Sequence, residues 1–180
     1  MKGRRFISQR RVVHVYCEGP TEVNLFSFLK SKYHNKKVAF RGGKDMGGCG
    51  DIVTCMREHE KVVTGLGMRP KNQYKNVKLL YIIDNDLPDS SKIERYLKKE
   101  DCIVQLCDPN TEGMIMSIIG KPVIKEVGDK DYRYKCKKVF KVHFGCEAHE
   151  LSESKMIDIF KNIEVVSKYM PELHKLLSCL

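Results

Sequence analysis

The sequence lacks the segments that would direct a chain into or across a membrane. No apolar run approaches the roughly 20 residues that a bilayer-spanning helix requires. The N-terminal residues are basic, and no apolar h-region precedes Val12, so we expect no secretory signal. The eight cysteines include no Cys-x-x-Cys pair, and without a secretory signal they indicate a reducing compartment rather than a disulfide framework. We therefore expect a cytoplasmic protein with no membrane partner.

Acidic residues are in the minority. The 180 residues include 33 Lys and Arg against 23 Asp and Glu, which gives a net charge of +10. Such an excess favours an anionic partner, nucleic acid before others, although a merely soluble basic surface would have the same composition. The length and the apolar fraction of 42% fit one globular domain with a substantial core.

The stretch 77–86, V-K-L-L-Y-I-I-D-N-D, organises the rest of the chain. Its apolar run is too short for a helix and is typical of a central strand buried on both faces. Asp84 and Asp86 stand where this strand would leave the sheet. Alternate residues of an extended chain point to the same side, so one cation could meet both carboxylates. The bland alternative is that D-N-D-L-P only forms a turn.

Two further predicted strands also end in acids. Residues 12–16 are a β-branched run that ends in C-E-G-P-T-E, and residues 103–107 form a strand that ends in D-P-N-T-E-G. Favourable placement near a helix N-terminus would also explain Glu18 and Glu22. Open parallel sheets bind ligands at the carboxyl ends of their strands. The acids expected together at that edge are Glu18, Asp84, Asp86 and either Asp108 or Glu112.

Strands and helices alternate over residues 12–119, which predicts an α/β fold with a mostly parallel sheet and helices on both faces. We divide the chain into a core at 11–120 and a small α-rich C-terminal extension at 121–180, packed on the same domain. The extension is expected to contain a helix pair broken near Pro171.

Five glycines occur within residues 41–51, after a predicted edge strand at 36–40. Glycine lets backbone amides approach phosphate closely, and Arg41 and Lys44 add positive charge. The spacing fits neither a Walker motif nor a dinucleotide fingerprint. We interpret the stretch as a mobile loop facing the substrate, with a flexible connection as the alternative. Asp51 is expected to cap the helix that follows.

The acids and the basic balance together suggest phosphodiester chemistry. Crowded carboxylates repel one another unless a divalent cation neutralises them, and oxygen ligands alone favour Mg²⁺ or Mn²⁺ over zinc. A basic surface would attract a polyanion, while the metal would compensate the acids and activate a phosphate.

The motifs also resemble a known family. The pattern V-V-H-V-Y-C-E-G-P-T-E, followed by L-L-Y-I-I-D-N-D, resembles the Toprim domain of topoisomerases, primases and overcoming-lysogenization-defect nucleases. It is most similar to the RloB-like Toprim proteins of bacterial defence and restriction loci. The segment D-P-N-T-E-G-M-I of this chain resembles the N-P-x-x-E segment of those proteins. The resemblance covers residues 11–120. The chain departs from the pattern at Gly113-Met114, where a bulky aromatic commonly follows the glutamate, and in a shorter region after residue 120.

This resemblance implies a Toprim-like, Rossmann-like fold and a metal-dependent nuclease that cleaves DNA or RNA, in bacterial anti-phage defence. It also implies possible partners, namely an ATPase or restriction and defence proteins, and possible homo-oligomers. The alternative function is a catalytically silent nucleic-acid-binding or regulatory module. A phosphatase-like or nucleotidyl-transfer reaction at the same metal site is a third possibility.

The resemblance also implies roles for individual residues. Glu18 would be a metal ligand or a general acid/base, Asp84 and Asp86 would hold Mg²⁺, and Glu112 would bind a second ion. The cations that would bind nucleic acid or stabilise transition-state charge are Arg41, Lys44 and Lys92, with Lys44 the catalytic candidate.

Two patterns in the extension allow other interpretations. Cys136, His143, Cys146 and His149 are possible zinc ligands, although their spacing fits no standard finger and scattered core cysteines with surface histidines are favoured. Residues 132–138 interleave aromatics with cations, which is typical of a single-strand-binding surface and equally of a strand with one solvated face.

Overall fold

The computed structural model describes residues 11–32, 38–47, 50–68, 77–126, 129 and 131–177. Four parallel strands form one sheet in the order β2-β1-β3-β4. The strands are β1 (Arg11–Cys17), β2 (Val38–Asp45), β3 (Val77–Asp84) and β4 (Ile103–Cys107). The helices are α1 (Pro20–Lys32), α2 (Ile52–Gly65), α3 (Ser90–Lys99), α4 (Thr111–Ile118), α5 (Tyr132–Phe144), the 3₁₀ helix η1 (Ala148–Glu150), α6 (Glu153–Ile159), α7 (Ile163–Tyr169) and α8 (Pro171–Leu177). The predicted α/β, Rossmann-like fold is confirmed.

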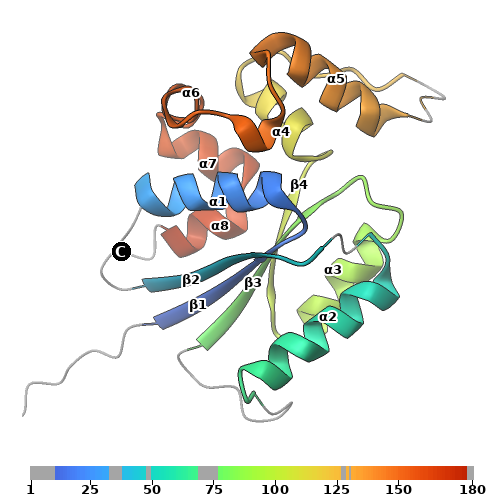
Figure 1. Ribbon diagram of the computed structural model, residues 1–180, viewed down its shortest axis with the longest axis vertical. Helices are drawn as coiled ribbons and strands as arrows, with labels where there is room; N and C mark the ends of the chain where they lie inside the picture. Colours follow the sequence, from blue (N-terminus) through green and yellow to red (C-terminus); the bar gives the residue numbers. More distant parts are fainter. Residues whose placement is uncertain are drawn as a thin grey trace, which may run out of the picture.

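Helices cover both faces of the sheet, as predicted. Helices α1, α7 and α8 lie over one face, and α2 and α3 lie over the other (Figure 1). Helices α4 and α5 lie beyond the carboxyl end of β4. None of the helices in the described ranges has the length and apolar character that crossing a bilayer requires.

Strand β3 is the buried central strand that its apolar run predicts. Its side chains alternate between two hydrophobic clusters, one on each face of the sheet. Leu80 and Ile82 belong to the cluster beneath α1 and the C-terminal helices, whereas Leu79, Tyr81 and Ile83 belong to the cluster beneath α2 and α3. Burial on both faces leaves the carboxyl end of β3 as the place where its polar residues can act.

The order in which strands are added to the sheet reverses between β1 and β3. Strand β2 pairs with one side of β1, and β3 pairs in parallel with the other side, with Cys17 opposite Ile82. Parallel sheets bind ligands at such a switch point, because the loops after the two neighbouring strands turn away from each other there. Glu18 follows β1 and Asp84 ends β3, so the topology brings these two acids together.

The glycine-rich stretch begins as a strand rather than a loop. Strand β2 is the predicted edge strand, but it continues through Arg41 and Lys44 to Asp45, so our loop interpretation was wrong for this half. Gly42 has φ +95°, and a Cβ atom there would lie 2.6 Å from the carbonyl oxygen of Val15. Close approach to β1 therefore requires this glycine. Lys36, Lys37, Gly48 and Cys49 lie outside the described residues.

Residues 132–138 belong to a helix, so the strand interpretation of this segment was wrong. Cys136 and Phe140 are the buried residues of α5, and Lys138 between them is exposed, which fits the helical period and not the alternation of a strand. Further along the chain, Pro171 separates α7 from α8, as predicted. Residues of α4, α5, α7 and α8 share one hydrophobic cluster with β1 and α1. The C-terminal helices therefore pack on the core of the sheet.

Candidate functional site

A cleft of about 320 Å³ opens where β1 and β3 end. Its charged lining residues are Glu18, Glu22, Asp45, Asp84, Glu112, Arg133 and Lys137. Four of these acids are buried, namely Glu18, Glu22, Asp84 and Glu112. Burial raises the pKa of all four carboxyls. The cleft therefore concentrates carboxyls whose charged forms are disfavoured by burial and would be compensated by a cation.

Glu18 joins the ends of the two central strands. Its backbone N–H donates to the carbonyl oxygen of Ile82 at 3.0 Å, and its Oε2 accepts from the backbone N–H of Asp84, also at 3.0 Å. Burial raises the pKa of Glu18, whereas the hydrogen bond from Asp84 opposes that rise. Because Oε2 is held in this way, Oε1 is the oxygen that faces the cleft cations.

Thr111 connects Asp84 to Glu22. Its backbone N–H, at the start of α4, donates to Asp84 Oδ1 at 3.0 Å. Its hydroxyl oxygen lies 2.7 Å from Glu22 Oε1 and 3.2 Å from Asp84 Oδ1. A hydroxyl has one proton and can donate to one of these oxygens only, so a second hydrogen bond requires a protonated carboxyl. Burial raises the pKa of Glu22 to about 7 and that of Asp84 well above its usual range.

Glu22 lies deeper in the site than its position in the first turn of α1 suggests. The backbone N–H of Gly19 donates to Glu22 Oε2 at 3.0 Å, while Thr111 holds the other oxygen. Placement near a helix N-terminus is the alternative explanation that the sequence offers for this acid, and the predicted metal site does not include it. The sequence feature that could have indicated its place in the site is the second glutamate of E-G-P-T-E.

Asp86 has one buried oxygen without a hydrogen bond. Its Oδ2 accepts from Asn110 Nδ2 at 2.8 Å, whereas its Oδ1 is buried and accepts no hydrogen bond from any described residue. Asn110 also caps α4, since its Oδ1 accepts from the backbone N–H of Gly113 at 2.8 Å. A buried carboxylate oxygen without a donor is costly unless a cation approaches it.

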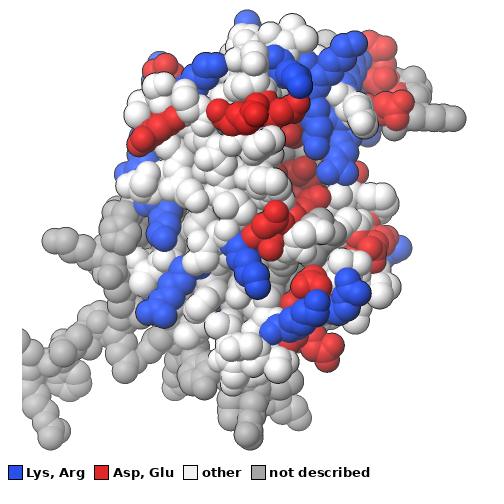
Figure 2. Space-filling model, viewed as in Figure 1, with Lys and Arg blue, Asp and Glu red and all other residues white. Residues whose placement is uncertain are grey.

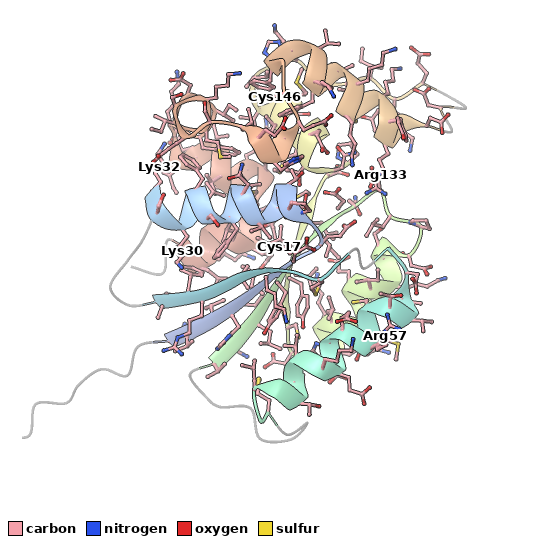
Figure 3. The ribbon with its side chains drawn as sticks, in the orientation of Figure 1. Cys17, Lys30, Lys32, Arg57, Arg133 and Cys146 are labelled. Carbon is pink, nitrogen blue, oxygen red and sulfur yellow. The ribbon has the colours of Figure 1, made fainter. Side chains whose placement is uncertain are left out.

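Arg133 and Lys137 supply the positive charge of the cleft. Arg133 points from α5 toward the ends of β1 and β3 (Figure 3). Its Nη2 lies 3.8 Å from Glu18 Oε1, and its Nε lies 4.0 Å from Asp86 Oδ1. The charge of Lys137 lowers the pKa of Glu18 and Glu112, against the larger effect of burial. We had not named either cation as a site residue, although both belong to the cation-rich segment 132–138 and lie four positions apart.

The cations that we had named lie elsewhere. Arg41 pairs in the sheet with His14, and Lys92 forms an ion pair of 2.7 Å with Asp89. The pKa of Glu58 on α2 is lowered mainly by its hydrogen bond from Lys61, and the charge of Lys44 adds a smaller effect. The described residues that line the cleft do not include Arg41, Lys44 or Lys92. The structure therefore does not bring these three side chains to the acids.

The third motif contributes Glu112 rather than Asp108. Glu112 is buried in the first turn of α4 and lines the cleft, whereas Asp108 is exposed and accepts from Asn85 Nδ2 at 2.8 Å. The departure at Gly113 has a steric reason. A Cβ atom there would lie 2.8 Å from Pro109 and 3.0 Å from Cys136 Sγ, so no side chain fits between α4 and α5.

The acids fit a hard divalent cation by donor type and burial. Carboxylate oxygens are the ligands that Mg²⁺ and Mn²⁺ prefer, and Oδ1 of Asp86 is a buried oxygen that lacks a donor. Within the described ranges, however, no three Asp, Glu, His or Cys side chains already form a group that could hold an ion. Glu18 and Asp86 instead face Arg133. The side chains of Glu18 and Asp86 would have to turn away from Arg133 to complete the coordination shell of a metal ion.

The alternative zinc ligands lie at different places around α5. Cys136 is buried next to Gly113, whereas His143 is exposed and lies 3.4 Å from the Nζ atom of Lys121. Cys146 follows the end of α5, and His149 lies in η1.

None of the three comparisons with known proteins found a match, whether with family models, with curated proteins or with solved structures.

Proposed function

We propose that this chain is a metal-dependent nuclease of the Toprim type, which cleaves phosphodiester bonds in nucleic acid with Mg²⁺ or Mn²⁺. One observation carries the proposal: Glu18 at the end of β1 is hydrogen-bonded to Asp84 at the end of β3, beside the buried Oδ1 of Asp86, which accepts no hydrogen bond from the described residues. The acids come from separate motifs and converge at the switch point of a parallel sheet, where ligands bind.

Glu18, Asp84 and Asp86 would hold the ion, and Glu112 is the candidate for a second one. Bound there, a divalent cation would compensate the acids and activate the phosphodiester. The raised pKa values of Glu18, Asp84 and Glu112 support this assignment, because burial disfavours the charged forms of these three carboxyls and a bound cation would compensate them.

The remaining roles follow from what each side chain already contacts. Glu18 is the candidate general acid/base, since its Oε2 is held by Asp84 and its Oε1 remains to take or give a proton. Arg133 and Lys137 replace Lys44 as the cations that would bind the phosphate, because both line the cleft.

The test compares Glu18→Gln with Asp158→Asn, an exposed acid on α6, on single-stranded and double-stranded DNA and RNA with and without Mg²⁺. We expect Glu18→Gln to lower metal-dependent cleavage about 100-fold or more and Asp158→Asn to leave it unchanged. Calorimetry should also show that Asp84→Asn/Asp86→Asn weakens Mg²⁺ binding. Cleavage that survives Glu18→Gln would refute the assignment.

A nucleic-acid-binding or regulatory module without catalysis is the second candidate. The contacts of Arg133 with Glu18 and Asp86 favour it, because an arginine can neutralise these acids without a metal. Nucleic-acid binding that is unaffected by Glu18→Gln, with no cleavage by either protein, would select this alternative. The anti-phage role, its partner proteins and a homo-oligomer rest on the resemblance, and co-purification with proteins of the host locus would test them.

A further inference from the structure

Helix α5 borders a second groove, of about 570 Å³, next to the acidic cleft. This α5 groove is lined by Arg133, Tyr134, Lys137, Lys138, Lys141 and Glu147. Arg133 and Lys137 also line the acidic cleft. The two hollows therefore adjoin each other at these two side chains.

The charge of the groove follows from helical spacing. Positions 133, 137 and 141 form one row on α5, and positions 134 and 138 form the adjacent row. From residue 133 to residue 141 the helix rises about 12 Å. Four of the six lining residues are cations, and the one acid, Glu147, lies 2.6 Å from Lys141. Figure 2 shows Lys and Arg side chains gathered over α5, above acidic side chains at the end of the sheet.

Tyr134 adds an aromatic surface to this row of cations. It is 77% exposed, so its ring is not part of the hydrophobic core. An exposed ring beside lysines is the combination with which proteins bind single strands, because a base stacks on the ring while the cations contact phosphates. In a duplex each base is already stacked between its neighbours.

We propose that the α5 groove binds a single strand of nucleic acid and leads its backbone toward the acidic cleft. Lys138 and Lys141 bind phosphates away from the cleft, Tyr134 stacks on a base, and Arg133 with Lys137 receives the backbone at the cleft. The direction of the strand rests on the proposed nuclease function, whereas the binding itself does not.

The first test measures binding of a fluorescently labelled 12-nucleotide single strand by anisotropy, in EDTA and at several salt concentrations. Lys138→Gln/Lys141→Gln should weaken binding and reduce the slope of log affinity against log salt by about 1.4, since each phosphate contact on a single strand contributes about 0.7. The matched control is Lys99→Gln/Lys161→Gln, which removes the same charge from exposed residues outside both hollows. Equal slopes for the two double variants would show that the strand is attracted only by the overall charge of the protein, and would overturn the proposal that it binds in the α5 groove.

The second test separates a single strand from a duplex. Tyr134→Ala should weaken single-strand binding roughly ten-fold or more, Tyr134→Phe should retain it, and neither should change the affinity for a duplex of the same sequence. A Tyr134→Ala variant that binds the single strand normally, or that loses duplex binding equally, would contradict the proposal. Circular dichroism should show that all variants keep their helix content.

Failure of this inference can be distinguished from failure of the nuclease. Single-strand binding that depends on Lys138, Lys141 and Tyr134, without any metal-dependent cleavage, would uphold the groove and refute the nuclease. Cleavage that depends on Glu18, together with single-strand binding that is unchanged in the Lys138, Lys141 and Tyr134 variants, would uphold the nuclease and refute the groove.

Discussion

The guanidinium of Arg133 lies 3.8 Å from Oε1 of Glu18, so a residue of the C-terminal segment faces the end of the first strand. The arginine is 45% exposed, whereas Glu18 is buried. One side of the guanidinium therefore meets the acids while the other remains open to solvent. Helix α5 is part of the site and not only an addition to the sheet.

Removing this arginine should tighten the binding of a divalent cation. In Arg133→Gln the acids lose a competing positive charge, so we expect calorimetry to show Mg²⁺ affinity several-fold higher. Single-strand binding should weaken in the same variant, because Arg133 also lines the α5 groove. Arg95→Gln, on the exposed surface of α3, is the control. Weaker Mg²⁺ binding by Arg133→Gln would mean that the arginine supports the metal site rather than competing with it.

Without a metal, the protein should lose stability as pH rises toward 8. Burial raises the pKa of Glu22 from 4.5 to about 7, so the folded state binds this proton more tightly than the unfolded state. The stabilisation is complete below pH 4.5 and is lost as pH rises through 7. For Glu22 alone the loss approaches about 3 kcal/mol. Urea unfolding in EDTA between pH 5 and 8 measures it.

Glu22→Gln should flatten that pH dependence, and Asp158→Asn should leave it unchanged. Asp84, Glu18 and Glu112 have pKa values raised in the same direction, so part of the slope should remain in Glu22→Gln. Mg²⁺ should restore stability above pH 7. A wild-type protein whose free energy of unfolding rises between pH 5 and 8 would contradict the protonated cluster.

Thr111→Val should destabilise the protein by about 1–3 kcal/mol, because a buried hydroxyl that serves two carboxyls is removed without a change of shape. Thr111→Ser keeps the donor and should retain most of the stability. Urea unfolding at pH 6 compares the two variants. A Thr111→Val variant as stable as the wild type, with a loss only in Thr111→Ser, would show that the methyl group matters and the hydrogen bonds to Glu22 and Asp84 do not.

Asn110 offers a test in which metal reverses the outcome. Asn110→Asp keeps an oxygen that can cap α4 but replaces the donor to Asp86 with a second carboxylate. We expect this variant to be destabilised in EDTA and to recover when Mg²⁺ is added. Asn110→Ala loses the cap and should cost about 1 kcal/mol or more in both conditions. Melting temperatures with and without Mg²⁺ provide the comparison.

The sequence predicts the part of the site that local pattern controls. Apolar runs identify β1 and β3, and an acid after each strand is enough to expect Glu18 and Asp84 at one edge. Arg133 and Lys137 reach the same cleft only because α5 packs against α4. No local pattern records that long-range contact.

Two errors have the same physical origin. Residues 132–138 alternate aromatics and cations with the period of a strand, yet Cys136 and Phe140 are buried while Lys138 between them is exposed, which is a helical pattern. Gly42 looks like a loop residue, yet contact with Val15 in a neighbouring strand requires it. In each case tertiary packing overrides the local signal.

The missing side chain at Gly113 allows α5 to pack closely against α4. Because no Cβ atom separates α4 from Cys136, α5 lies close enough for Arg133 to face Glu18. Any larger residue at position 113 would act as a spacer and move the arginine outward. The acids would then lose a neutralising partner without any change among themselves.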